Sequence, residues 1–125
     1  MRSLKVLVVD DSAIVTMKLK SYLEELGHQV VGIAKTGEEG VKMFQEWAPD
    51  LVTMDIVMPD MNGIEATKKI MNESASAIVV MVTSHGQEQM VMDSIVAGAK
   101  GYILKPFNKY TIKEYVDKLM GNYKR

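Results

Sequence analysis

Short apolar runs alternate along the chain with longer segments in which apolar residues recur every three or four positions. The runs contain β-branched residues without a polar residue at every second position, which is typical of strands buried on both faces of a parallel sheet. Five such strands are predicted, at residues 5–10, 29–34, 51–54, 77–82 and 102–104.

The segments between the strands are predicted to be helices, at 13–26, from Thr36 to Pro49, at 63–73, at 87–97 and after Thr111. Ser12 is a suitable N-cap, and Thr36 and Thr111 are each followed three residues later by Glu, which indicates a capping box. Glycines 27, 98 and 121 are expected to end three of these helices. Val41, Phe44 and Trp47 define the apolar face of the second helix.

Strict alternation of strands and helices with short connections predicts a doubly wound α/β fold. The crossovers must be right-handed, so the helices cover both faces of a five-stranded parallel sheet. No repeat or linker-like tract interrupts the pattern, and we expect one domain over residues 1–125.

Composition narrows the class of function. The formal net charge is −1 at pH 7, so no global basic field favours nucleic acid or an anionic membrane. The chain lacks cysteine, which excludes disulfides, thiolate metal sites and thiol catalysis. The apolar segment near the N-terminus is too short for a signal peptide or a membrane span, and a cytoplasmic location is expected.

Polar residues follow four of the five predicted strands. Asp10 and Asp11 follow the first strand, Asp55 the third, Thr83 the fourth and Lys105 the fifth. Ligands of open α/β sheets bind beyond the carboxyl ends of the strands, so these side chains are expected to meet at one site. Three converging carboxylates repel one another, and a hard divalent cation such as Mg²⁺ would relieve that repulsion.

Such a site is suited to phosphoryl transfer. Asp55 can act as a carboxylate nucleophile that forms an acyl phosphate. Lys105 and the Thr83 hydroxyl can stabilise the charge on the phosphoryl oxygens.

The residues at the strand ends, together with the segments 8–12, 54–63, 82–84, 98–102 and 105–107, resemble receiver domains of two-component response regulators over essentially the whole chain. The resemblance implies a flavodoxin-like sheet of order 2-1-3-4-5 and a phosphoryl group supplied by a histidine kinase. It also implies that the protein catalyses only its own phosphorylation and dephosphorylation.

The resemblance further assigns roles to individual residues. It implies Asp55 as phosphoacceptor, Asp10 and Asp11 as metal-site acids and the Val57 backbone carbonyl as a further metal ligand. Lys105, preceding a cis proline bond, would contact the phosphoryl group. Thr83 and Tyr102 would be the switch hydroxyl and the switch aromatic residue.

Within the family, residues 50–71 and 84–107 are most similar to free-standing chemotaxis regulators of the CheY type. This implies a protein target, a flagellar or archaellar motor component, bound through the face formed by the fourth helix, fifth strand and last helix. Met90 and Met92 lie on different sides of the fourth helix, so one of them can lie on that face.

The resemblance to receivers places Val57 and His85 at positions whose side chains influence attack of water on the acyl phosphate. Val57 cannot hydrogen-bond a water, and we expect it to prolong the phosphorylated state. The other histidine, His28, follows Gly27 and is expected at the surface.

Several alternatives remain open. The chain could be a phosphorelay intermediate or the receiver of a DNA-binding response regulator. A Mg²⁺-dependent phosphohydrolase is less favoured, because Asp10 is followed by Asp11 and Ser12 and not by the usual Asp-x-Asp. A flavodoxin-like carrier is disfavoured because the two carboxylates would repel a flavin phosphate, and no P-loop signature is present.

Overall fold

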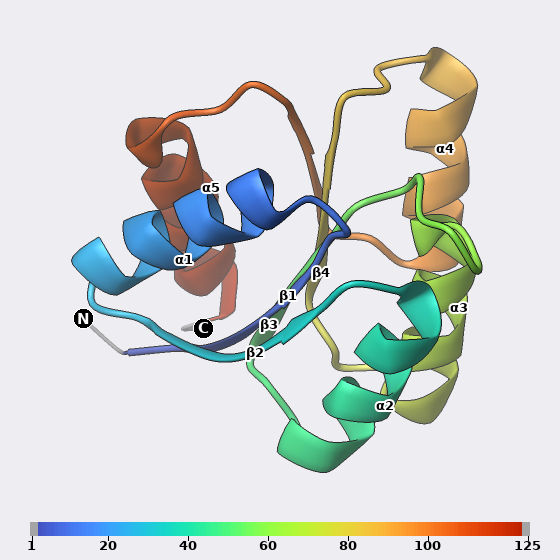
Figure 1. Cartoon of the computed structure of the whole chain (residues 1–125), viewed down its shortest axis with the longest axis horizontal. Helices are drawn as coiled ribbons and strands as arrows, with labels where there is room; N and C mark the ends of the chain where they lie inside the picture. The colour runs from blue at the N-terminus through green and yellow to red at the C-terminus, as the bar shows by residue number, and fades with distance from the viewer. Residues whose placement is uncertain (1–2, 124–125) are drawn as a thin grey trace.

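The computed structural model describes residues 3–123 and consists of five consecutive strand–helix units (Figure 1). The strands are β1 (Lys5–Val9), β2 (Gln29–Ala34), β3 (Leu51–Met54), β4 (Val79–Thr83) and β5 (Gly101–Leu104). The helices are α1 (Ala13–Glu25), α2 (Gly37–Trp47), α3 (Gly63–Glu73), α4 (Glu88–Ala97) and α5 (Lys109–Tyr123). Among the described residues, no helix combines the length and apolar character that a membrane span requires.

The five strands form one parallel sheet in the order β2-β1-β3-β4-β5, which confirms the predicted topology. Val9 at the end of β1 pairs with Ala34 of β2 and with Met54 of β3. Thr83 at the end of β4 pairs with Leu104 of β5. The carboxyl ends of the strands are therefore aligned along one edge of the sheet.

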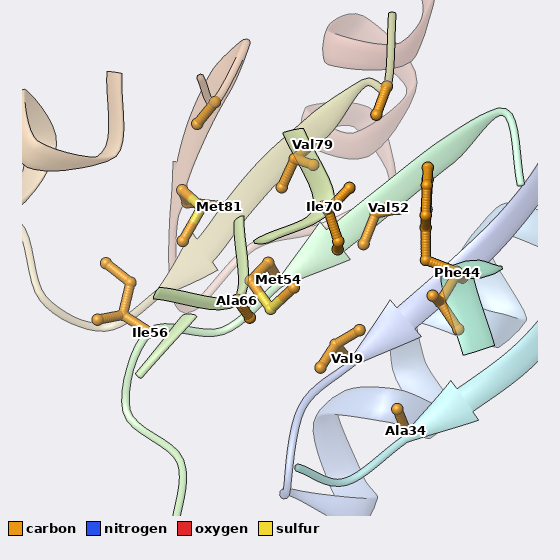
Figure 2. Packing of buried hydrophobic residues seen from close by; sticks show 13 residues of the cluster. Val9, Ala34, Phe44, Val52, Met54, Ile56, Ala66, Ile70, Val79 and Met81 are labelled. Atoms are coloured by element: carbon orange, nitrogen blue, oxygen red, sulfur yellow. The ribbon is translucent and has the colours of Figure 1, made fainter. Parts of the chain in front are cut away.

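Helices cover both faces of the sheet, with α1 and α5 on one side and α2, α3 and α4 on the other (Figure 1). Alternate strand residues point to opposite faces, so the protein has two apolar cores. The core beneath α2 to α4 includes Leu7, Val9, Val52, Met54, Ile70 and Met81 (Figure 2). The core beneath α1 and α5 includes Val6, Val8, Leu19, Leu23, Val82 and Val116.

Polar side chains begin most of the helices. Ser12 accepts a hydrogen bond from the Val15 N–H, and Thr36 accepts one from the Glu39 N–H, as predicted. In the second case the Glu39 carboxylate binds the Lys35 N–H, one residue before the cap.

The predicted capping box at Thr111 is wrong. The helix begins two residues earlier at Lys109, and Asn108 accepts the Thr111 N–H at 3.0 Å. Gly121 does not end this helix, which continues to Tyr123.

Two side chains lie elsewhere than their local sequence indicated. His28, expected at the surface, is buried. Its Nδ1 accepts the Leu4 N–H at 3.1 Å, a contact that holds the residue before β2 beside the residue before β1. Trp47, expected on the buried face of α2, is exposed at the last turn of the helix, where Ala48 adopts a left-handed conformation.

Candidate functional site

Three carboxylates meet at the carboxyl edge of the sheet. Asp10 and Asp11 directly follow β1, and Asp55 directly follows the neighbouring β3. One oxygen from each lies within 4.8 Å of those of the other two. Asp10 and Asp55 are buried, whereas Asp11 is exposed, so the cluster opens to solvent on one side.

The backbone around Asp55 is held on two sides. The Asp55 N–H donates to the Val9 carbonyl at 2.9 Å, continuing the pairing of β3 with β1. On the other side, the first residue of α3, Gly63, lies so close to Asp55 that an added Cβ atom would be 1.9 Å from the Asp55 carbonyl oxygen. Only glycine allows this approach, and its N–H also donates to the Ile56 carbonyl at 2.7 Å.

Lys105 supplies the positive charge of the site from the end of β5. Its Nζ lies 2.8 Å from Oδ2 of Asp10 and 3.5 Å from Oδ1 of Asp55. The Lys105–Pro106 peptide bond is cis, as the family resemblance implied.

The surroundings of Asp55 disfavour its ionised form. Burial, followed by the negative charge of Asp10, raises the pKa of Asp55 above its ordinary value of 3.8. Lys105 and the Ile56 N–H, which donates to Asp55 Oδ1 at 2.9 Å, act in the opposite direction without reversing the shift. A single lysine therefore compensates the carboxylates only in part.

The donor set fits Mg²⁺. Asp10, Asp11 and Asp55 offer only oxygen ligands, which this hard cation prefers. Each of the three has an oxygen close to those of the others, and the raised pKa of Asp55 indicates a site that an added cation would stabilise.

The side chains expected from β4 and β5 are connected through the loop that follows β4. The fully buried Thr83 hydroxyl accepts the His85 N–H at 3.3 Å. The Tyr102 hydroxyl donates to the His85 carbonyl, and burial raises the pKa of Tyr102. The Tyr102 carbonyl in turn accepts the Tyr115 hydroxyl of α5 at 2.8 Å. Thr83 and Tyr102 thus contact the same loop residue.

Val57 lies in the β3–α3 loop, which comprises residues 55–62, and is 53% exposed. The contacts that hold this loop were not predicted from the sequence. Asp60 accepts two N–H groups from the start of α2, and Asn62 accepts the Glu65 N–H of α3 at 2.9 Å. The Asn62 contact follows from its N-cap position, but that of Asp60 joins residues 22 and 23 positions apart and has no local signal.

The structure therefore brings Asp10, Asp11, Asp55 and Lys105 directly together and links Thr83, His85 and Tyr102 by hydrogen bonds. A hollow of about 620 Å³ beside Phe44 and Ala77 adjoins Leu4, Asp50 and Ile78, which precede strands. It lies at the opposite edge, so the carboxylate cluster defines the candidate site.

The doubly wound sheet thus gathers three aspartates and a lysine at its carboxyl edge. Residues 6–117 match the family described as response regulator receiver domain, and the chain belongs to this family.

Relatives of known function are similar over nearly their whole length. The chain is 44% identical to the chemotaxis protein CheY of Thermotoga maritima, over 92% of this chain and 96% of that protein. It is 43% identical to the chemotaxis protein CheY of Bacillus subtilis, over 94% and 98%. The CheX–CheY–BeF₃–Mg²⁺ complex from Borrelia burgdorferi contains a similar structure, with a TM-score of 0.90 and 34% identity over 93% of this chain and 88% of that chain.

Proposed function

We propose that this protein is a Mg²⁺-dependent phosphoacceptor switch in which Asp55 receives a phosphoryl group from a phosphohistidine of a histidine kinase. The observation that carries the proposal is the meeting of Asp10, Asp11, Asp55 and Lys105 at the carboxyl edge of the sheet. When bound, Mg²⁺ would be held by the three carboxylates and the Val57 carbonyl, and it would neutralise charge on the transferring group.

The arrangement of the Asp55 carboxylate indicates which oxygen reacts. Oδ1 accepts the Ile56 N–H and faces Lys105, so we assign the attack on phosphorus to Oδ2. A new O–P bond forms as the P–N bond to the donor imidazole breaks, and the released imidazole nitrogen takes a proton from solvent. Lys105, already within 3.5 Å of Asp55, would pair with a phosphoryl oxygen, and the Thr83 hydroxyl would donate to another.

The phosphoryl group would act on a partner through the loop after β4. A Thr83 hydroxyl drawn toward the phosphoryl group would no longer accept the His85 N–H, and the His85 carbonyl also holds Tyr102. Both loop and tyrosine would change the face formed by α4, β5 and α5. Exposed apolar and aromatic residues of these three elements include Met92, Ile95, Val96, Leu104 and Tyr110. The output is binding; the protein catalyses only its own phosphorylation and dephosphorylation.

We further propose a role in chemotaxis, with a cytoplasmic flagellar or archaellar motor component as the target. The support is the similarity to chemotaxis proteins CheY over nearly their full lengths. Phosphorylated protein should bind a motor peptide more tightly than unphosphorylated protein. Equal binding by the two forms would favour a phosphorelay intermediate or the receiver of a DNA-binding regulator.

The direct test of the phosphoacceptor proposal is transfer of one phosphoryl group to Asp55 from a small phosphodonor. The mass of the intact protein reports the number of groups, and fragment masses locate them. A group on another residue would refute the assignment.

A further inference from the structure

Asp60 joins the β3–α3 loop to the N-terminus of α2. Its Oδ1 accepts the Gly37 N–H at 3.0 Å, and its Oδ2 accepts the Glu38 N–H at 2.9 Å. Both carboxylate oxygens are thus used, and each binds a different backbone amide of the first helical turn. An exposed aspartate in a turn has no need of such contacts for its own solvation.

These contacts complete the N-terminus of α2. The first four N–H groups of a helix have no partner within the helix. In α2 the Gly40 N–H makes the first bond within the helix, to the Thr36 carbonyl, and the preceding Glu39 N–H donates to the Thr36 hydroxyl. The Gly37 and Glu38 N–H groups, which also lack a partner within the helix, donate to Asp60, so the loop caps two N-terminal donors of a helix far away in sequence.

The neighbouring residue reinforces the contact. Met61 lies against Gly37, where an added Cβ would be 2.4 Å from Met61 Cγ. At the other end of the loop, Asn62 caps α3 and the Gly63 N–H binds the Ile56 carbonyl. The short stretch between Asp55 and α3 is therefore fastened to two helix N-termini.

The charge of Asp60 suits this position. A helix N-terminus favours a negative side chain. The N–H of Glu38, more than any other group, holds the pKa of Asp60 below its ordinary value. Asp60 is thus ionised throughout the physiological pH range and binds the helix as a carboxylate.

We propose that Asp60 is a positioning residue, which holds the β3–α3 loop in the conformation that Mg²⁺ binding requires and thereby couples the metal site to the N-terminus of α2. The inference rests on the proposed function, because it takes Val57, three residues before Asp60, as a source of a metal ligand. Coupling is reciprocal, so a contact that favours Mg²⁺ binding must itself be favoured by Mg²⁺.

The first test compares Mg²⁺ dissociation constants of the full chain and its Asp60 variants by calorimetry. We expect Asp60→Ala to weaken Mg²⁺ binding by about tenfold, as loss of two hydrogen bonds to a carboxylate allows. Asp60→Asn keeps one acceptor oxygen and should give an intermediate value. Glu46→Ala, which removes a carboxylate from an exposed position of α2, should bind Mg²⁺ like the parent.

The Asn variant separates positioning from charge. Both Asp60 variants lose the same negative charge, so a long-range electrostatic effect would weaken Mg²⁺ binding equally in the two and would overturn the proposal. Thermal unfolding without Mg²⁺ establishes that the variants are folded. If Asp60→Ala does not fold, the test is made with Asp60→Asn, which must still bind Mg²⁺ more weakly than Glu46→Ala.

The second test measures hydrogen exchange at the Gly37 and Glu38 amides. In the parent, Mg²⁺ should slow exchange at these two amides several-fold, and in Asp60→Ala it should leave them unchanged. Unchanged exchange in a parent that binds Mg²⁺ would overturn this inference and leave the phosphoacceptor proposal intact. A parent that neither binds Mg²⁺ nor accepts a phosphoryl group would refute both.

Discussion

The ammonium group of Lys105 lies 2.8 Å from Oδ2 of Asp10, a residue 95 positions earlier in the chain. The contact joins the ends of β5 and β1, which are separated in the sheet by β3 and β4. Asp10 also accepts the Ser12 N–H at 2.8 Å through its other oxygen, so the carboxylate is bound on both sides. Lys105 therefore stabilises the cluster before any phosphoryl group is present.

Replacing Lys105 should make folding stability depend strongly on Mg²⁺. In Lys105→Met, two buried carboxylates lose their cation, and the free energy of unfolding without Mg²⁺ should fall by roughly 3 kcal/mol. Mg²⁺ should restore a large part of the loss. Urea unfolding with and without Mg²⁺ measures both effects, and Lys109→Met, which removes an exposed pair with Glu25, is the control. An identical loss in both conditions would contradict a shared cation site.

Val57 is predicted to lengthen the life of the phosphorylated state. Its exposed apolar side chain offers no hydrogen bond to a water that attacks the acyl phosphate. Val57→Asn should accelerate loss of the phosphoryl group, roughly tenfold, because an amide can orient that water. Val57→Ala, which adds no polar group, should not. The decay of phosphorylated protein after removal of the donor gives the rates, and equal rates for Asn and Val would refute the idea.

Acidification should destabilise the fold through His28. Burial lowers the pKa of His28 below its ordinary value of 6.5, and the nearby Asp117 only partly opposes the shift. Below pH 6.5 the unfolded chain therefore binds more protons than the folded one. The contribution of His28 to stability is complete above that pH and decreases as the pH falls toward the folded pKa.

The matched variant for this prediction is His28→Asn. Asparagine can accept the Leu4 N–H but does not titrate, so the variant should lose less stability than the parent between pH 7 and pH 5. Denaturant unfolding at several pH values measures the slopes, and parallel curves for parent and His28→Asn would exclude a role for His28.

Two buried threonines should respond in opposite ways to the same substitution. The Thr53 hydroxyl, in β3, is the only fully buried side-chain polar atom without a hydrogen-bond partner among the residues the structure describes. Thr53→Val should raise the free energy of unfolding by about 1 kcal/mol. Thr67→Val should lower it by a similar amount, because the Thr67 hydroxyl donates to the Gly63 carbonyl at 2.7 Å. Thermal unfolding gives both changes, and a destabilised Thr53→Val would contradict the assignment.

The sequence predicts the strands and helices well because most of them carry their own signals. Short runs rich in β-branched residues place β1 and β3, and Ser12, Thr36 and Asn62 begin their helices. The failures are contacts between distant segments. His28 looks like a loop residue until β2 pairs with β1 and brings the Leu4 N–H to its ring. Trp47 fits the apolar period of α2, but it falls on the final turn, beyond the core.

The site follows from the sequence to the extent that topology determines it. Parallel strands bring Asp10, Asp11, Asp55 and Lys105 to one edge of the sheet, but they do not determine which side chains contact one another there. The preference of Lys105 for Asp10 over Asp55 depends on distances within that edge and has no sequence signal. The same holds for Asp60, whose partners lie on another helix.

The central claim is that Asp55 accepts a phosphoryl group with the help of Mg²⁺ held by its neighbours. The most direct measurement is the intact mass of the protein after incubation with a small phosphodonor, with and without Mg²⁺, for the parent, Asp55→Ala and Asp11→Asn. We predict one added phosphoryl group on the parent with Mg²⁺, little without it, much less on Asp11→Asn and none on Asp55→Ala. An unmodified parent, or an adduct that persists on Asp55→Ala, would contradict the account.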